Sequence, residues 1–485
     1  MKKLVLKSLL TSTIILLAIT CAVAQTPTKV WNLQRCIQYA TQNSLNIKRA
    51  NIAVENAQLT EKASRLARYP NLNASGNYNI NLGRSIDPTT NEFNAQSFQS
   101  NGFSLSTGVT LFNGGRINNT IKQSKLDMEA AKIDMDAAKN DIALNVAASY
   151  LQILLADEQL ANAKRQLIQT EDQLKQTNQL IDAGVIPAND RLDIEAQIAQ
   201  NQQVIIQAEN AVQSNYLVLY NLLEKDLSEN IIIEVPEVSI PADANPNQFT
   251  FEQVMASAIG IMPELKAQEV RQESAALGVD IARAGKLPTL SIGGGVNTNW
   301  ASLAKEFVLD PNGAVELGSA QPFNVGGMDV LVAQYFPSGE LVNKAYGSQL
   351  NENFGQAVGI SLNIPIYNNG RNDINIQRAQ LNVLNSEVAY NQALQGVKAN
   401  VQRAVADAKA GEKNYQAAQK TMSSAEIAYA NAKKRFDLGA INTFELTTAK
   451  ARLDAAEISM TQAKFQYLFN LKILDFYLGR KLTID

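Results

Sequence analysis

Residues 117–183 contain neither proline nor glycine, and this uninterrupted stretch constrains the fold more than any other feature of the sequence. Apolar residues recur in it every seven positions in two runs: Ile121, Met128, Met135 and Ile142, then Ile153, Leu160, Leu167, Leu174 and Ile181. A seven-residue apolar repeat is typical of helices that pack side by side. One helix over 117–183 would be about 100 Å long. Since this is several times the diameter of a compact domain, the helix must pack along other long helices.

The long helix is predicted to turn back as a hairpin. Gly184 ends the pattern and Pro187 follows it. The seven-residue spacing then resumes in a return helix, through Ile198, Ile205, Val212 and Leu219. Because glycine at positive φ is a common helix stop, the tip of the hairpin is predicted near residue 184.

The second half of the chain resembles the first. Residues 33–59 align without gaps with residues 251–277, and Gly184 corresponds to Gly439. The sequence Leu-Phe-Asn-Gly-Gly-Arg before the first long helix corresponds to Ile-Tyr-Asn-Asn-Gly-Arg before a second one. The distance from this motif to the tip glycine is the same in both halves, so the two long helices should be equally long.

We therefore interpret the chain as internally duplicated. A first repeat spans residues 25–232 and a second spans 233–485, with its hairpin tip near residue 439. The second repeat carries an insertion between Pro288 and Gly370, which includes a longer loop over about 301–350.

Ahead of each long helix the apolar period falls to two, which is the period of a β-strand. The pattern predicts four strands, over about 70–83, 102–112, 288–300 and 354–367. In the first, Leu72, Ala74, Gly76, Tyr78, Ile80 and Leu82 alternate with Asn71, Asn73, Ser75, Asn77, Asn79 and Asn81. Strands of this length with one apolar and one amide face suit a barrel that has lipid outside and water inside. A half-buried sheet of a soluble protein is the alternative.

The N-terminus has the pattern of a signal peptide over residues 1–24. Lysines precede an apolar run over 9–19, and Ala22-Val23-Ala24 offers a small-residue cleavage site. About 11 apolar residues are too few for a membrane-spanning helix. Lipidation at Cys21 is the other interpretation, although the residues before it match a lipoprotein cleavage site poorly.

Composition argues against an enzyme. The sequence has no histidine and two cysteines, Cys21 and Cys36. Histidine is the usual general base and the commonest metal ligand, and thiolate metal sites need several cysteines. Gly293-Gly294-Gly295 lies within a predicted strand, so we expect a bend there and not a phosphate-binding loop. The sequence therefore predicts no catalytic residues, no metal site, no cofactor and no nucleic-acid partner.

Four strands cannot close a barrel, and an open sheet edge in lipid leaves backbone N–H and C=O groups unpaired. Identical chains must then supply the missing strands. Eight strands from a dimer would leave almost no lumen, whereas twelve from a trimer would leave a narrow one. The polar strand faces argue for a wet interior, so the sequence favours a trimer. A periplasmic helical scaffold or adaptor without a pore remains the alternative.

The chain resembles the TolC family of outer-membrane efflux proteins over nearly its whole mature length. The resemblance rests on several motifs in order: the two strand–helix motifs at 111–116 and 366–371, the tip turns Ala183-Gly184-Val185-Ile186 and Leu438-Gly439-Ala440-Ile441, and the ending Phe465-Gln466-Tyr467-Leu468-Phe469-Asn470-Leu471. No single motif would suffice, but together they are specific.

The resemblance implies an α+β membrane protein of the Gram-negative outer membrane. In this family, three chains form a 12-stranded β-barrel, continued by a long α-helical coiled-coil tunnel in the periplasm. The family works with a periplasmic adaptor (membrane fusion) protein and an inner-membrane RND- or ABC-type transporter. Whether the cargo is drugs, metals or proteins is left undecided by the resemblance.

The resemblance also implies roles for individual residues. The hairpin tips of the family meet the adaptor, which corresponds here to Gly184, Val185, Ile186, Gly439, Ala440 and Ile441. Acidic residues close the tunnel, which corresponds to Glu445 and, in the first repeat, Asp190. The strand–helix junctions are Gly115, Arg116, Gly370 and Arg371.

Two positions depart from the family pattern. Thr448 stands at the family's next acidic position, and Ile441 replaces a basic residue that often follows the second tip glycine. The resemblance therefore implies neither a double carboxylate ring nor, in its known form, the polar lock between helices that some members have. Glu445 and Asp190 have a purely structural alternative, because a carboxylate suits the first turn of any helix.

Overall fold

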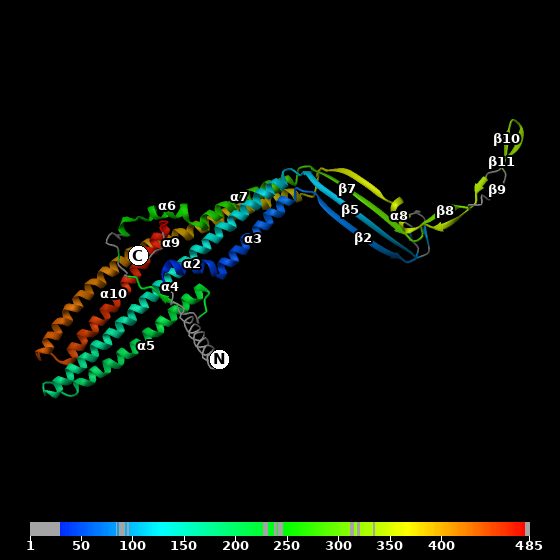
Figure 1. The fold of residues 1–485 in the computed structure, drawn as a ribbon. Coiled ribbons are helices and arrows are strands. Elements are labelled where there is room, and N and C mark those ends of the chain that lie inside the picture. Colours follow the sequence, from blue (N-terminus) through cyan, green and yellow to red (C-terminus); the bar gives the residue numbers. More distant parts are fainter. Residues whose placement is uncertain are drawn as a thin grey trace, which may run out of the picture. The chain divides into compact units, whose positions relative to one another are not determined.

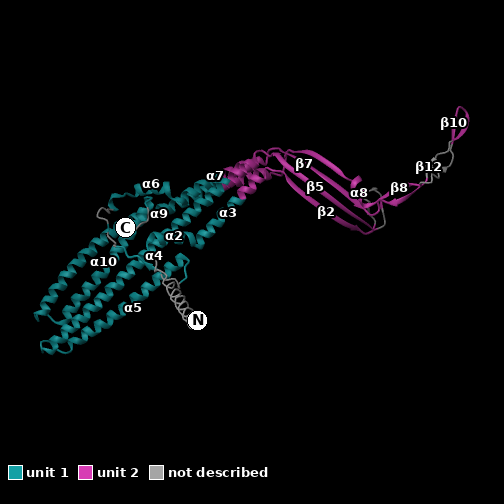
Figure 2. Cartoon of the chain, viewed as in Figure 1, with its two compact units in different colours: residues 1–59, 125–274, 383–485 teal, residues 60–124, 275–382 magenta. Residues whose placement is uncertain are grey.

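A computed structural model describes residues 30–480 except 84, 87–92, 95–96, 227–230, 237–239, 241–245, 311–314, 318–320 and 333–334. The predicted signal peptide and Cys21 lie outside the described residues. The described chain forms two compact units, within residues 1–59, 125–274 and 383–485 and within 60–124 and 275–382 (Figure 2). Each unit takes segments from both halves of the sequence, so the compact units do not coincide with the sequence repeats.

Two long helices dominate the fold, as their unbroken sequences predict. Helix α4 (Arg116–Asp182) and helix α9 (Arg371–Asp437) each have 67 residues, so the predicted equal length is confirmed. Each turns back into a shorter helix, α5 (Asp190–Leu223) and α10 (Thr443–Tyr477). The hairpin α4–α5 lies beside the hairpin α9–α10 (Figure 1), and Asn162 of α4 donates to Thr461 of α10 at 3.2 Å.

Each half also contains two shorter helices ahead of its strands. In the first half these are α2 (Leu33–Asn43) and α3 (Leu45–Leu66), and in the second α6 (Phe251–Ile261) and α7 (Pro263–Ala284). Strand β1 (Val30–Trp31) pairs in parallel with β6 (Ile232–Ile233), and a short 3-10 helix, η1 (Pro246–Gln248), precedes α6.

Two hydrophobic clusters fix these helices. One gathers Cys36, Tyr150, Ile153, Leu154 and Leu219 with their neighbours, and the other gathers Val254, Ala258, Leu265, Val401 and Leu474. Cys36 is fully buried, as expected for a core residue. The clusters match in position along the two halves because both use the same spacing of apolar residues.

A four-stranded antiparallel sheet belongs to the other compact unit. Its strands are β2 (Asn71–Asn81), β5 (Phe98–Phe112), β7 (Thr289–Ala301) and β14 (Gly355–Asn363). The order across the sheet is β14-β7-β5-β2, so the two sequence halves meet at the β5–β7 pair. Strands β2 and β14 are the edges, and the sheet is open within one chain.

The sheet differs from the sequence pattern at three places. Strand β14 ends at Asn363, because Pro365 has no N–H group to continue the ladder. Strand β5 already begins at Phe98, where it pairs with Asn81. The expected bend at Gly293–Gly295 is not seen in the ladder, whose register is continuous there and shifts instead between Thr110 and Phe112. A Cβ on Gly295 would lie 2.8 Å from the Leu105 carbonyl oxygen, so this glycine serves close strand packing.

The insertion of the second half lies between β7 and β14. Helix α8 (Tyr346–Glu352) packs on the end of β7, where Gln349 accepts from the Ala301 N–H at 3.0 Å. Strand β8 (Lys305–Leu309) pairs with β13 (Gly339–Asn343), β9 (Val315–Leu317) with β12 (Tyr335–Pro337), and β10 (Gln321–Val325) with β11 (Met328–Val332). In the first half a pair of two-residue strands, β3 (Ser85–Ile86) and β4 (Phe93–Asn94), takes this place. Among the described helices, none is both long enough and apolar enough to cross a membrane.

Left-handed residues link each strand to its long helix. Gly114 and Gly115 have φ values of 67° and 81°, and Asn369 and Gly370 have 56° and 74°. A Cβ on Gly114 would lie 2.8 Å from the Leu287 side chain, whereas a Cβ on Gly115 would meet nothing within 4 Å. A substitution at Gly115 therefore tests backbone strain alone, whereas one at Gly114 tests backbone strain together with steric overlap.

We expect Gly115→Ala to lower the free energy of unfolding by about 1–2 kcal/mol, the usual cost of a left-handed alanine. Gly114→Ala should cost a further ~1–3 kcal/mol, because it also overpacks against Leu287. Urea unfolding in detergent, followed by circular dichroism, measures both values. Adding Leu287→Gly to Gly114→Ala removes both Leu287 atoms that lie 2.8 Å from the added Cβ and should recover part of the extra loss; equal losses for the two single variants would contradict the overlap at Gly114.

Candidate functional site

One face of the four-stranded sheet consists of amide, hydroxyl and small residues. The strand registers bring to this face Asn71, Asn73, Ser75, Asn77, Asn79 and Asn81 of β2, Ser100, Gly102, Ser104, Ser106 and Gly108 of β5, Thr289, Ser291, Gly293, Gly295, Asn297 and Asn299 of β7, and Gly355, Ala357, Gly359, Ser361 and Asn363 of β14. The hydroxyls of Ser75 and Ser104 are 2.7 Å apart across the strand pair. We call this surface the amide face.

The opposite face is mostly apolar and exposed, with Gln99, Asn101 and Thr107 of β5 among its polar residues. It carries, among others, Leu72, Tyr78, Ile80, Phe103, Leu105, Val358, Ile360 and Leu362. Val358 is 83% exposed and Ile360 is 70% exposed, so this face is not covered by the rest of the described chain. A contiguous apolar surface of this kind marks contact with a membrane or with another protein.

The hairpin tips are narrow turns closed by the two predicted glycines. Gly184 and Gly439 have φ values of 71° and 69°. The N–H of Val185 donates to the Leu180 carbonyl at 2.9 Å, and that of Ala440 donates to the Arg435 carbonyl at 2.8 Å. These bonds satisfy carbonyls at the helix ends in the manner of a Schellman cap. A Cβ on either glycine would meet nothing within 4 Å, so both turns are open to the outside.

The two predicted acidic residues lie in the first turns of α5 and α10. Asp190 is the first residue of α5, and the Thr443 hydroxyl donates to its carboxylate at 2.9 Å. Thr443 is buried and begins α10, so this bond joins the tips of the two hairpins. Glu445 is exposed, and its backbone N–H donates to the cap residue Asn442 at 2.9 Å.

The two hairpins also meet through a polar contact close to Ile441, the residue that stands where some family members have a basic one. The structure contains a polar bond between the hairpins, made by Thr443 and Asp190. Thr448 instead donates its hydroxyl to the Phe444 carbonyl in its own helix at 2.8 Å.

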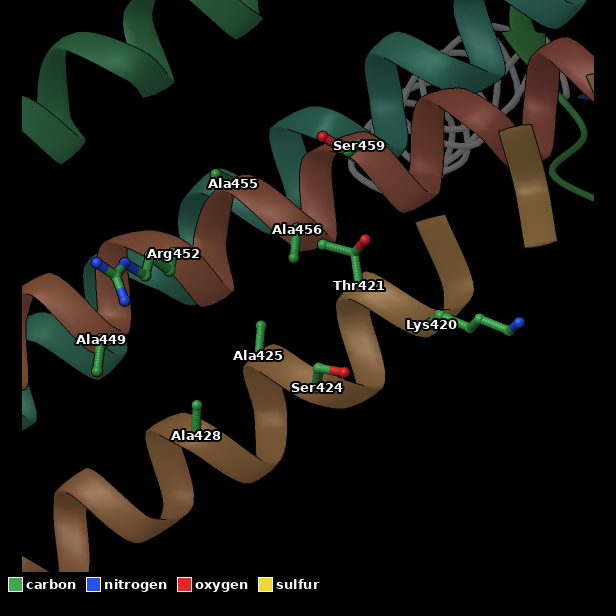
Figure 3. A pocket seen from close by; sticks show the side chains of 10 residues that line it. All are labelled: Lys420, Thr421, Ser424, Ala425, Ala428, Ala449, Arg452, Ala455, Ala456 and Ser459. Atoms are coloured by element: carbon green, nitrogen blue, oxygen red, sulfur yellow. The ribbon is translucent and has the colours of Figure 1, made fainter. Parts of the chain in front are cut away.

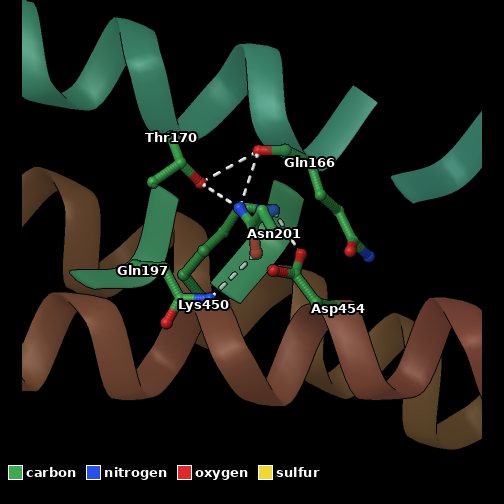
Figure 4. A network of polar contacts seen from close by, with 6 residues as sticks. All are labelled: Gln166, Thr170, Gln197, Asn201, Lys450 and Asp454. Atoms are coloured by element: carbon green, nitrogen blue, oxygen red, sulfur yellow. Dashed lines mark hydrogen bonds and ion pairs between the residues drawn. The ribbon is translucent and has the colours of Figure 1, made fainter. Parts of the chain in front are cut away.

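A buried polar seam runs along the tip half of α4. Its residues follow helical spacing and are Asn162, Gln166, Thr170, Gln173 and Thr177, all less than 9% exposed. Asn201 of α5 donates to Thr170 at 2.9 Å, and Figure 4 shows this contact beside Gln166 and Gln197. Within the described chain, Gln166 Nε2, Gln173 Nε2 and Thr177 Oγ1 are buried without a hydrogen-bond partner. The buried surface of α4 near the tips is therefore polar.

The polar seam and the seven-residue apolar stripe of α4 differ in burial within one chain. In the tip half, Leu160, Leu167, Leu174 and Ile181 are only half-buried, whereas the residues of the polar seam and Ala163 are buried. The tip half of α4 thus has a polar stripe and an apolar stripe. The apolar stripe is still partly exposed, so it can pack against another helix.

A buried ion pair in α10 faces the same seam (Figure 4). The Lys450 ammonium contacts the Asp454 carboxylate one turn away, with 4% and 13% of these side chains exposed. Burial raises the pKa of Asp454, and the bond from Lys450 partly offsets that rise. The Lys450 ammonium also lies 5.7 Å from the Tyr429 ring centre. Sequence inspection missed this pair because an exposed Lys–Asp pair at the same spacing is common on helices.

A groove of about 660 Å³ separates parts of α9 and α10 (Figure 3). Most of its lining is small: Thr421, Ser424, Ala425, Ala428, Ala449, Ala455, Ala456 and Ser459. Lys420 and Arg452 are the charged residues of its wall. Among the described residues, no group of histidine, cysteine or acidic side chains is arranged to hold a metal ion.

A family model described as "Outer membrane efflux protein" matches residues 36–224 and 255–480. The two matched segments contain both long hairpins and the whole four-stranded sheet. No curated protein sequence matches the chain.

Solved structures of outer membrane proteins share the fold. CusC, a protein described by its folding and transmembrane channel formation, superposes with a TM-score of 0.71 at 19% identity, covering 93% of this chain and 92% of that one. VceC of Vibrio cholerae gives 0.72 at 15% identity, with coverage of 93% and 96%. The CmeC outer membrane channel of Campylobacter jejuni gives 0.69 at 17% identity, with coverage of 93% and 87%. At these identities the likeness shows a common fold.

The bond between the tips predicts a local effect of Thr443→Val. Losing a hydrogen bond to a carboxylate should reduce the stability of the tip by about 1–2 kcal/mol. Hydrogen exchange of the first-turn amides of α5 and α10 measures that loss directly.

Thr447→Val is the matched control, because its hydroxyl donates to Thr443 and Phe444 carbonyls within its own helix. We expect faster exchange in both α5 and α10 for Thr443→Val, and in α10 alone for Thr447→Val. The same response of α5 to both variants would show that the Thr443–Asp190 bond does not hold the hairpins together.

Proposed function

The chain belongs to the outer membrane efflux protein family, and from this premise we propose that three copies of it form one continuous export channel. The protein lies in the outer membrane and extends into the periplasm. In the proposed channel, the sheets cross the membrane as a closed barrel and the helical hairpins form a tunnel below it. Cargo reaches the tunnel from an inner-membrane pump and leaves the cell through the barrel.

The observation that carries this proposal is the open sheet with two unlike faces. Its apolar face is exposed, its amide face is polar, and its edge strands β2 and β14 each pair on one side only among the described strands. In lipid, each unpaired backbone group costs several kcal/mol. Pairing β2 of one copy with β14 of the next removes both edges, and three copies supply 12 strands with a water-filled interior.

The helical hairpins support the same symmetry. The half-buried apolar stripe of Leu160, Leu167, Leu174 and Ile181 repeats every seven residues, which suits packing against a further long helix. Three copies supply six hairpins, so each chain gains neighbours on both sides. The channel then needs no membrane-spanning helix.

We assign the hairpin tips to regulation and docking. The tip residues Gly184, Val185, Ile186, Gly439, Ala440 and Ile441 form open turns that a periplasmic adaptor protein can contact. Glu445 is exposed next to the second tip, and three copies around the axis would form an acidic ring that attracts cations. In this assignment Asp190 holds Thr443 and so positions the ring. An RND- or ABC-type transporter is the pump that such a channel serves.

The first experiment is the mass of the detergent-extracted particle, corrected for bound detergent. We expect three chains per particle, because this number closes the barrel with a lumen. A stable monomer would leave the strand edges open and would refute the channel. A dimer would also refute it, because an eight-stranded barrel has almost no lumen.

Glu445→Gln tests the acidic ring. Loss of three like charges should weaken block of the single-channel current by Mg²⁺ about tenfold, because the local attraction of cations falls. Glu426→Gln serves as the control, since it removes an exposed carboxylate from α9 well before the tip. Equal effects of the two variants on Mg²⁺ block would remove Glu445 from the aperture.

A further inference from the structure

None of the residues in β2, β5, β7 and β14 is Asp, Glu, Lys or Arg. The amide face therefore presents only asparagine, serine, threonine, glycine and alanine along its length, apart from Phe98 at one end. Charged residues make up 18% of the whole chain, so the sheet departs strongly from the composition of the rest.

A membrane explains the missing charges on only one face. Charges on a lipid-facing surface are destabilising, whereas residues that face a water-filled lumen can carry charge freely. Ionisable residues do occur directly beyond the strand ends, as Arg68 before β2, Lys286 before β7 and Lys305 after it. The lack of charge on the amide face is thus a property of that surface.

The side chains of the amide face place hydrogen-bond donors and acceptors in rows along the strands. Alternate residues of a strand are about 6.7 Å apart, and asparagine fills five of the six positions of β2 on this face. Each amide offers both a donor and an acceptor, and neither carries net charge.

Glycines beside the asparagines leave room for their amides to lie along the sheet. A Cβ on Gly102 would lie 2.9 Å from Asn77 Oδ1, and a Cβ on Gly355 would lie 3.2 Å from Asn297 Oδ1. These contacts show that the two amides lie over the neighbouring strands. The surface is polar, its side chains rise little above the sheet, and it has no site of concentrated charge.

We propose that the amide face is a charge-free lining of the barrel, which lets polar cargo of either sign or of none pass the membrane section without electrostatic selection. This inference rests on the proposed channel. Any selection by charge then occurs in the helical section, where acidic and basic side chains are abundant. Amides and hydroxyls without carboxylate, imidazole or thiolate are also weak ligands for transition metals. The lining therefore suits organic polar cargo better than it suits metal ions bound in transit.

The test introduces charge at Asn77 in the full-length protein in planar bilayers. Asn77→Asp changes the shape of the side chain little, and three copies place three carboxylates in the lumen. We expect the K⁺ to Cl⁻ permeability ratio, taken from the reversal potential in a KCl gradient, to rise about fivefold over that of the unmodified channel. Asn77→Lys should lower the ratio by a similar factor, and the neutral control Asn77→Ser should leave it unchanged.

The outcomes separate this inference from the proposed function. A channel whose permeability ratio follows the sign of the charge at residue 77 supports both. A conducting channel in which Asn77→Asp and Asn77→Lys leave the ratio unchanged overturns the lining and keeps the channel. A detergent-extracted particle that is a monomer or a dimer overturns the proposed function itself.

Discussion

The backbone hydrogen-bonding groups at the two edges of the four-stranded sheet constrain the surroundings and the assembly of this protein more than any other feature. Strands β2 and β14 end the sheet within one chain, while the apolar face beside them is exposed. In water such edges invite aggregation, and in lipid they are prohibitively costly. Pairing between copies removes the edges, and the trimer we propose places the apolar face toward lipid and the amide face toward water.

The long helices obey a different constraint. A helix of 67 residues cannot bury its length against a small core, so it must lie along others of similar length. Away from the tips, the helices pack against one another through the apolar clusters around Tyr150 and Val401. Toward the tips, the buried stripe of α4 is polar and only partly hydrogen-bonded, so the hairpins are held there by fewer and more specific contacts. The Thr443–Asp190 bond is one of them.

Periodicity predicted the elements well, because spacing along the chain determines which residues share a face. The equal length of α4 and α9, the turns at Gly184 and Gly439, and the alternation in β2 follow from local pattern. Contacts between segments distant in sequence could not be predicted in this way. Thr443 gave no signal in the sequence, because its importance comes from Asp190 on another helix. The polar seam was hidden likewise, since burial of Gln166 or Thr177 depends on which stripe faces inward.

The four-stranded sheet and the helical hairpins differ in the charged residues that they carry. Charge on the lipid-facing surface of a sheet is destabilising, and here the amide face has no charged residue either. In the proposed channel the helical hairpins lie in the periplasm, and they carry ionisable groups that include the buried Lys450–Asp454 pair and exposed Glu445. In the proposed channel, a gate that uses charge therefore belongs at the tips. At the tips of the proposed channel, breaking one hydrogen bond between the hairpins can move the gate. The strands of the closed barrel cannot move in this way, because every strand is paired on both sides.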